Sequence, residues 1–249
     1  MKPLNKKTPL LVALLLSAAL SAYAQQQADP EGNFTFRIID NGRAVEITGH
    51  RVNNTDVRIP DRIQNLPVTV IGFDAFRGGE FVEGAFIMGN QLTSVIIPNS
   101  VTHIGEAAFA VNQLTSVIIP NSVTYIDESA FSNNQLTSVS IPDSVTYIGE
   151  FAFSSNQLTN ISIGNSVTQI GGFAFSENQL ASVNIPNSVM HISAGAFADN
   201  QLSSVSIPDS VTHIGNEAFL NNQLTNVSVP SVASIHSNAF DQQVTITRR

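Results

Sequence analysis

The sequence contains no cysteine and no tryptophan, and only 12% of its 249 residues are charged. Without cysteine the chain has no disulfide bond, no cysteine-ligated zinc or iron–sulfur cluster, no thiol nucleophile and no N-terminal cysteine for lipid attachment. Such a composition suits an oxidising compartment, where a free thiol would be a liability.

Basic residues are also scarce, and they are unevenly placed. All three lysines lie in the first seven residues, so the chain beyond residue 24 has eight arginines against nineteen acids, a formal charge of −11. No lysine or arginine occurs between Arg77 and Arg248, whereas twelve acids do. Nucleic acids and anionic lipid surfaces would repel such a chain, so we expect no nucleic-acid partner and no polybasic membrane docking.

Residues 1–24 have the pattern of a secretory signal peptide. A basic start is followed by an apolar run from Leu10 to Leu20 and by Ala22-Tyr23-Ala24. The run has 11 residues, whereas a membrane-spanning helix needs about 20. We therefore expect cleavage near Ala24, no membrane insertion afterwards, and a mature protein that is secreted, periplasmic or at the cell surface.

Beyond the leader, one unit of 22 residues repeats along most of the chain. The triplet Asn-Gln-Leu begins at Asn90, Asn112, Asn134, Asn156, Asn178, Asn200 and Asn222. A fixed period of this size is typical of solenoids and other repeat arrays. Because one short unit cannot bury its own apolar side chains, neighbouring units must stack and share a core.

Each unit predicts two extended pieces and a turn. In the unit at residue 134, Leu136-x-x-Val139-x-Ile141 reads as a short strand that Pro142 ends, since proline cannot donate to a ladder. Val145-x-x-Ile148-Gly predicts a second extended piece, and the following Ala-Phe pair a tight or helical turn. We expect the seven Ala-Phe pairs to form the core. Each leading asparagine should satisfy backbone groups at a bend.

Atypical segments flank the array, as a capped solenoid requires. An Asn41-Gly42 turn between two short alternating runs predicts a β-hairpin. We divide the chain into a signal peptide (1–24), a linker and capping hairpin (25–54), a degenerate first repeat with an insertion (55–89), seven repeats (90–242) and a closing strand (243–249).

The unit Asn-x-Leu-x-x-Val-x-Ile-Pro-x-x-Val-x-x-Ile-Gly-x-x-Ala-Phe resembles the BspA-type, or treponemal-type, leucine-rich repeat over residues 55–245. It is one residue shorter than the usual unit and keeps asparagine where many members alternate cysteine and asparagine. The resemblance implies a β-rich α/β solenoid: a right-handed, curved array with a parallel sheet on its concave face and short turns or 3-10 helices opposite. It also implies a surface or secreted protein, mostly of bacteria, and for some members adhesion to host matrix or cells.

Candidate contact residues alternate with the core positions of the first strand, so they should face outward on the concave sheet. They are Ser94, Ile96, Ser116, Ile118, Ser138, Ser140, Asn160, Ser162, Ser182, Asn184, Ser204 and Ser206. Their hydroxyl and amide groups can hydrogen-bond a glycan or a peptide backbone, although a solvated face of good strand formers gives the same pattern. Phe151 and Phe173 replace small residues of neighbouring units, which indicates either an apolar contact patch or additional core.

Metal and enzyme chemistry are not indicated. His191 and His213 should lie one unit apart, but a zinc site needs three or four ligands and we identify no third. Glu106, Glu128 and Glu150 recur in the same way, but calcium needs six to eight oxygens, so an acidic surface is the simpler interpretation. The sequence also lacks nucleophile-elbow, zinc-protease, phosphate-loop and dinucleotide motifs. We expect no catalytic residues and no cofactor.

Three function classes remain open. The first is an exported module that recognises an extracellular protein or glycan, as in adhesion. The second is a spacer whose repeat number matters more than its surface. The third is an ice-binding lattice, which the evenly spaced threonines from Thr102 to Thr212 suggest but Met190 interrupts.

Cleavage of the leader is directly testable. When the full chain is expressed in a Gram-negative host with a periplasm, the mature protein should leave the cytoplasm with Gln25 at its N-terminus, as read by Edman degradation. A chain that keeps residues 1–24 and stays with the membrane fraction would contradict this.

Overall fold

The computed structural model describes residues 28–82, 85–88 and 91–249. The expected signal peptide and Asn90 of the first triplet lie outside these residues. In the described parts of the chain the only helical elements are two 3-10 turns, η1 (Glu31–Asn33) and η2 (Asp40–Gly42). No helix there is long and apolar enough to span a bilayer.

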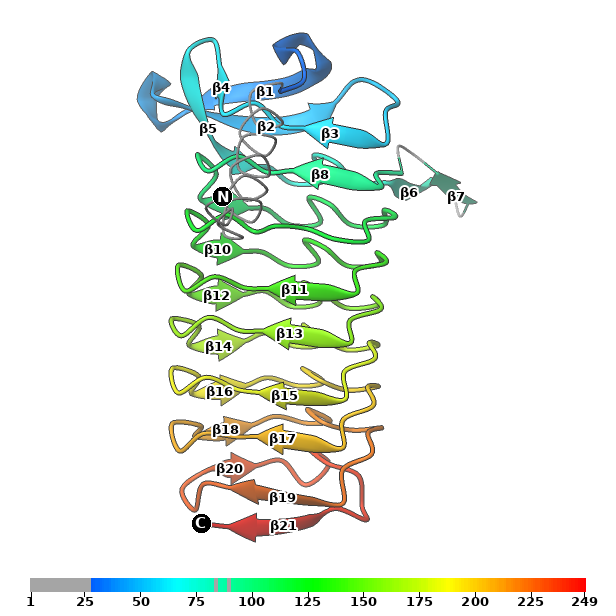
Figure 1. Ribbon diagram of the computed structural model, residues 1–249, viewed down its shortest axis with the longest axis vertical. Helices are drawn as coiled ribbons and strands as arrows, with labels where there is room; N and C mark the ends of the chain where they lie inside the picture. The colour runs from blue at the N-terminus through cyan, green and yellow to red at the C-terminus, as the bar shows by residue number, and fades with distance from the viewer. Residues whose placement is uncertain (1–27, 83–84, 89–90) are drawn as a thin grey trace, which may run out of the picture.

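Each repeat forms one rung of a tall stack and supplies up to two strands (Figure 1). The first strands of the rungs are β8 (Ser94–Ile96), β11 (Ser138–Ser140), β13 (Asn160–Ser162), β15 (Ser182–Asn184), β17 (Ser204–Ser206) and β19 (Asn226–Val229). The second strands are β9 (His103–Ile104), β10 (Tyr125–Ile126), β12 (Tyr147–Ile148), β14 (Gln169–Ile170), β16 (His191–Ile192), β18 (His213–Ile214) and β20 (Ser234–Ile235).

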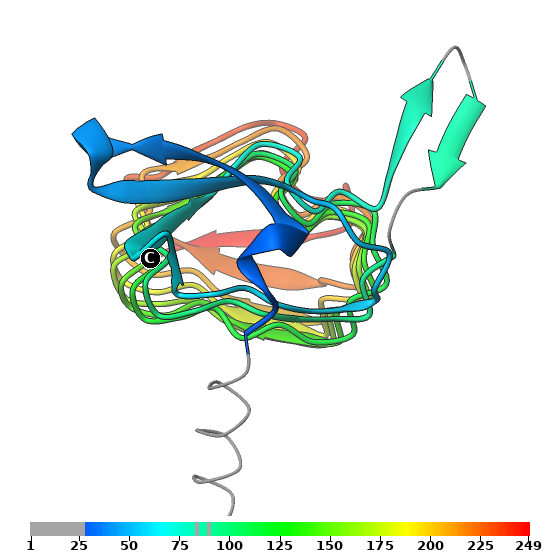
Figure 2. The same cartoon turned by 90° about the horizontal axis from the view of Figure 1, so that it is seen from above.

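The second strands build the long sheet of the molecule. It begins with β1 (Phe34–Ile39), β2 (Ala44–His50) and β5 (Leu66–Ile71), with β4 (Arg62–Ile63) beside β5. Its eleven strands are β4 and those in the order β1-β2-β5-β9-β10-β12-β14-β16-β18-β20. Its rungs pair in parallel one repeat apart, as Tyr125 does with Tyr147. The first strands pair only in twos, as β11–β13 and β15–β17, and residues 116–118 form no strand. The expected parallel sheet is confirmed, but its continuous ladder follows the second extended piece. Seen end-on, the rungs nearly superimpose, so curvature is slight (Figure 2).

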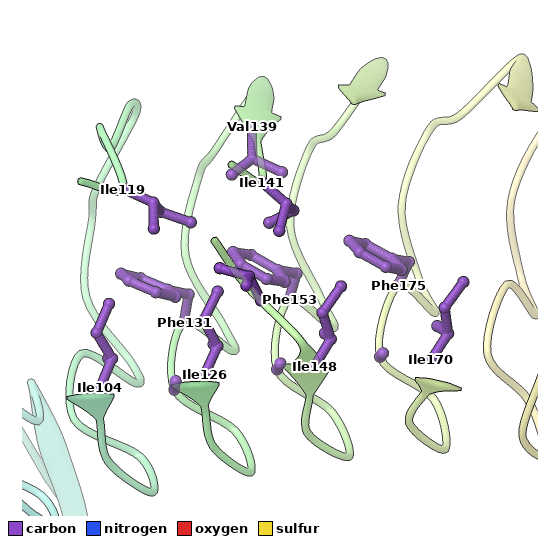
Figure 3. Close-up of a cluster of buried hydrophobic side chains, with 14 of the residues drawn as sticks. Ile104, Ile119, Ile126, Phe131, Val139, Ile141, Ile148, Phe153, Ile170 and Phe175 are labelled. Atoms are coloured by element: carbon purple, nitrogen blue, oxygen red, sulfur yellow. The ribbon is translucent and has the colours of Figure 1, made fainter. Parts of the chain in front are cut away.

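A single file of phenylalanines fills the stack. Phe76, Phe109, Phe131, Phe153, Phe175, Phe197, Phe219 and Phe240 follow one another with ring centroids 5.1 to 5.5 Å apart. In Figure 3 the file lies between Val139 and Ile141 of the first strand and Ile126 and Ile148 of the second strands. The rings from Phe109 to Phe219 are fully buried. The predicted core column is therefore confirmed.

Beside this file runs a ladder of buried asparagines. The amide nitrogen of Asn156 donates to the carbonyls of Phe153 and Ser154, which come just before it in the chain, at 3.2 Å each, and to that of Phe131, one repeat further back, at 3.0 Å. Its Oδ1 accepts from the backbone N–H of Leu136 at 3.0 Å. Asn112, Asn134, Asn178, Asn200 and Asn222 repeat the arrangement. The structural interpretation of these residues is confirmed.

The N-terminal cap is the expected antiparallel hairpin. Strands β1 (Phe34–Ile39) and β2 (Ala44–His50) flank η2, in which Asn41 has a φ of 54°. β2 then pairs in parallel with β5 (Leu66–Ile71), which brings the hairpin into register with the rungs. The degenerate rung adds β3 (Asp56–Arg58), which pairs with β8, and β4 (Arg62–Ile63).

The insertion forms a second hairpin. β6 (Gly79–Val82) and β7 (Ala85–Met88) pair in antiparallel register, with Phe81 opposite Phe86. Figures 1 and 2 show this hairpin standing away from the stack.

The C-terminal end is closed by β21 (Thr245–Arg248), which pairs in parallel with β19. The Arg248 guanidinium donates to the carbonyls of Ser231 and Ala233 at 3.0 Å each, and that of Arg249 to the carbonyl of Ser228 at 2.8 Å. The two arginines thus occupy backbone acceptors at the open end of the stack.

Removing one ladder asparagine should weaken the stack. Asn156→Ala leaves several buried backbone groups unpaired, at a cost of about 2–4 kcal/mol in the free energy of unfolding, as urea denaturation would measure. Gln157→Ala, which removes an exposed amide next to it, is the matched control and should change stability by no more than about 0.5 kcal/mol. Equal midpoints for the two variants would show that the ladder does not stabilise the stack.

Candidate functional site

The first-strand face consists of the twelve candidate contact residues named from the sequence. In the structure all are exposed except Ile96, which is half-buried, and Ile118 is 84% exposed. Ser140 and Ser162 hydrogen-bond each other at 2.9 Å. Among the described residues, the hydroxyls of Ser138, Ser182 and Ser204 have no protein partner. The face offers hydrogen-bonding groups at the rung period, without an aromatic or arginine anchor.

The long sheet lies on the opposite side of the phenylalanine file from the first strands (Figure 3), and its outward positions form a different column. Its rings stack in two groups: His103, Tyr125 and Tyr147, with centroids 5.0 and 4.5 Å apart, and His191 with His213 at 4.8 Å. Partial burial, followed by the neighbouring Tyr147, raises the pKa of the Tyr125 hydroxyl. Gln169 separates the two groups.

The threonine column beside these rings takes part in stacking. The hydroxyls of Thr124, Thr146 and Thr212 each donate to the carbonyl of the preceding rung at 3.2 Å. The hydroxyl hydrogens are therefore used within the protein, which weakens the case for an ice-binding lattice.

Beside His191 and His213 lies a feature that the sequence analysis missed. The imidazole hollow, a groove of about 660 Å³, is lined by side chains of Gln169, His191, Ser193, His213, Ser234, His236 and Ser237. The last unit is one residue shorter, and His236 follows Ile235 at the place where Gly215 follows Ile214. Aligning that final unit with its deletion would have revealed the third histidine.

The histidines do not make a metal centre. Among the described residues, no group of three histidine, aspartate or glutamate side chains could hold a metal ion. Glu106, Glu128 and Asp127 form an acidic surface, and burial together with the Glu128 charge raises the pKa of the Glu106 carboxyl. His103 Nε2 lies 3.7 Å from Asp127 Oδ2.

Phe151 and Phe173 stack face to face, with centroids 5.1 Å apart and planes 5° apart. Both have a φ of 54°, the left-handed conformation that this repeat position also adopts at Ala107, Ser129 and Gly195. The Phe173 ring covers Gly195, where any Cβ would collide with it. Phe173 therefore packs onto the next rung, while Phe151 stays 37% exposed.

The His50 side chain caps the phenylalanine file and is half-buried, with both ring nitrogens shielded from solvent. The His50 ring lies 5.4 Å from Phe34 and 5.6 Å from Phe76, and neither of its nitrogens has a hydrogen-bond partner. Burial lowers the pKa of His50, and the charge of Asp29 opposes this only partly. The hollow that His50 borders also holds Asp74 and Arg77.

The rung geometry can now be set beside known proteins. The sequence profile of the BspA type leucine rich repeat region matches with six copies, over residues 53–134, 79–201 and 124–247. The chain belongs to the BspA-type leucine-rich repeat family. No curated protein matches it at a significant level.

Solved leucine-rich repeat proteins share the fold. The chain is 26% identical to the leucine-rich repeat protein TpLRR of T. pallidum, covering 78% of this chain and 89% of that one, with a TM-score of 0.63. A leucine-rich repeat protein of Bacteroides ovatus is 22% identical over 87% of this chain and 66% of its own, with a TM-score of 0.54. The pneumococcal vaccine antigen PcpA is 15% identical over 90% and 88%, with a TM-score of 0.51.

The buried imidazole predicts acid sensitivity. Because the pKa of His50 is lower in the folded than in the unfolded chain, the unfolded state gains the proton first as pH falls through about 6.5, and stability is lost below that value. His50→Phe keeps the ring packing and removes the proton site. The fall in melting temperature from pH 7.5 to pH 5.0 should therefore be smaller in His50→Phe than in the parent protein.

An exposed histidine of the long sheet provides the comparison. His191→Phe should lose as much melting temperature as the parent between the two pH values. If His50→Phe lost as much melting temperature as the parent between the two pH values, the buried imidazole would not be the acid-sensitive group.

Proposed function

We propose that this BspA-type protein is an exported binding module that recognises an extracellular protein or glycan at or outside the cell surface, as in adhesion. The observation that carries the proposal is the first-strand face. On it, serine and asparagine side chains recur rung after rung, exposed and largely without partners in the protein. Apart from the Ser140–Ser162 pair, such groups can bond to a ligand's hydroxyls or amides without breaking an internal hydrogen bond.

The backbone beneath this face supports the proposal. Val139 and Val183, each between two outward polar residues, are buried in the core, and the phenylalanine file fixes the spacing of the rungs. Groups held in place lose little conformational entropy on binding, so weak hydrogen bonds along several rungs can add up. A long ligand with a regular backbone fits this arrangement better than a compact one.

The composition of this face is less suited to a spacer without a ligand. A spacer needs solubility as well as length, and charged side chains would provide the solubility. The outward positions of β11, β13, β15 and β17 carry no charge. Family membership agrees with a binding role in that repeat solenoids use such extended surfaces for recognition.

The proposal can be tested with purified residues 25–249 on arrays of glycans and extracellular matrix proteins. A partner that binds should lose at least tenfold in affinity when Ser138, Ser162 and Ser182 are changed together to alanine, which corresponds to about 1.4 kcal/mol. The melting temperature should stay within about 2 °C of the parent, because the changes are exposed.

Asn121→Ala with Asn187→Ala is the control, since both amides are exposed in the loops after the first strands. It should bind like the parent. The absence of any partner would favour the spacer function, and a partner that is insensitive to the serine changes would move the binding site off this face.

A further inference from the structure

The imidazole hollow lies on the long sheet, over β14, β16, β18 and β20 at the C-terminal part of the stack (Figure 1). Earlier rungs of the same column carry large rings, Tyr125 and Tyr147, whereas the final rung carries Ser234. The hollow exists because Ser234, the last residue of this column, has a small side chain, and because His236 stands two residues further along the same rung.

The hollow offers one uncovered aromatic ring face. His213 is stacked on one side by His191, with planes 24° apart. On its other side the neighbouring rung has Ser234, paired directly with it in the sheet, and a serine side chain is too small to cover an imidazole. A flat ligand can therefore stack on His213, as sugar rings do on planar side chains through their C–H faces.

The polar groups around this ring both donate and accept hydrogen bonds. The lining contains three imidazoles, the hydroxyls of Ser193 and Ser234, and the Gln169 amide. The backbone N–H of Asn238 donates to His236 Nδ1 at 3.3 Å, which places the proton of the neutral ring on Nε2. His213 Nδ1 shares a hydrogen bond with the Thr212 hydroxyl at 2.9 Å.

Charge selects among ligands. Among the residues that the structure describes, no aspartate, glutamate, lysine or arginine lines the hollow, and its titratable lining groups are the three histidines. Glu217 lies beyond His236, in the next groove. A chain with a formal charge of −11 beyond residue 24 opposes anionic ligands, and no cation site is built here. An uncharged ligand rich in hydroxyl groups is not repelled by the negative chain and needs no cation site.

We propose that the imidazole hollow is a binding site for a neutral saccharide unit, which stacks on His213 and hydrogen-bonds His236 and Ser234. Its volume lies within the range of small-molecule sites, and its polar lining matches hydroxyl groups better than apolar ones. The site is separate from the first-strand face and does not depend on it.

The test uses purified residues 25–249 and an array of neutral glycans at pH 7.5, followed by calorimetric titration of a glycan that binds. His213→Ala and His236→Ala should each weaken binding at least tenfold. Ser234→Phe, which covers the free face of His213, should abolish it. His103→Ala is the matched control, because it removes an imidazole from the same column outside the hollow, and it should leave affinity unchanged.

Three outcomes would overturn the proposal: no neutral glycan binds, binding survives His213→Ala and His236→Ala, or only anionic glycans bind. Glycan binding that falls with the triple serine variant instead would support the first-strand face and reject the hollow.

Discussion

Contact between successive rungs is the interaction on which the whole molecule depends. A single repeat supplies one phenylalanine, one asparagine and a few branched side chains. These are too few to shield one another from water. In the stack, each ring from Phe109 to Phe219 lies between two other phenylalanine rings, and each ladder asparagine ties its own rung to the one before. Stability is therefore a property of neighbours, which is why distinct caps close both ends.

The same constraint explains where functional variety can reside. Positions that face the file are fixed by the rung spacing, so Phe153 and Asn156 cannot change without cost to both neighbours. Outward positions are free to differ. The chain uses this freedom sparingly: the first-strand face stays almost uniform, while the long sheet changes from tyrosine to glutamine to histidine along its length. We expect recognition of a particular ligand at positions where the outward residues differ from one repeat to the next.

Much of the fold could be read from the repeat, because a period of 22 fixes which side chains must align. The phenylalanine file, the asparagine bends, the capping hairpin and the closing strand all follow from residue type and spacing. Which of the two extended pieces forms the long sheet did not follow from residue type and spacing. Two residues per rung, such as Tyr125 and Ile126, form its ladder. Strand propensity cannot show whether so short a segment or the longer first strand forms the continuous ladder. Pairing depends on the position that each rung takes on the one before it.

By itself, the sequence determined the solenoid, its family resemblance and the outward serine column, because each is a matter of periodicity. Only the tertiary structure decided that Phe173 packs over Gly195 and that His236 joins His191 and His213 around one hollow. The physical reason is that these contacts join different columns on different rungs. Their distances depend on the lateral offset between rungs and on the space left by small residues such as Ser234. Neither quantity can be calculated from the spacing of residues in the sequence.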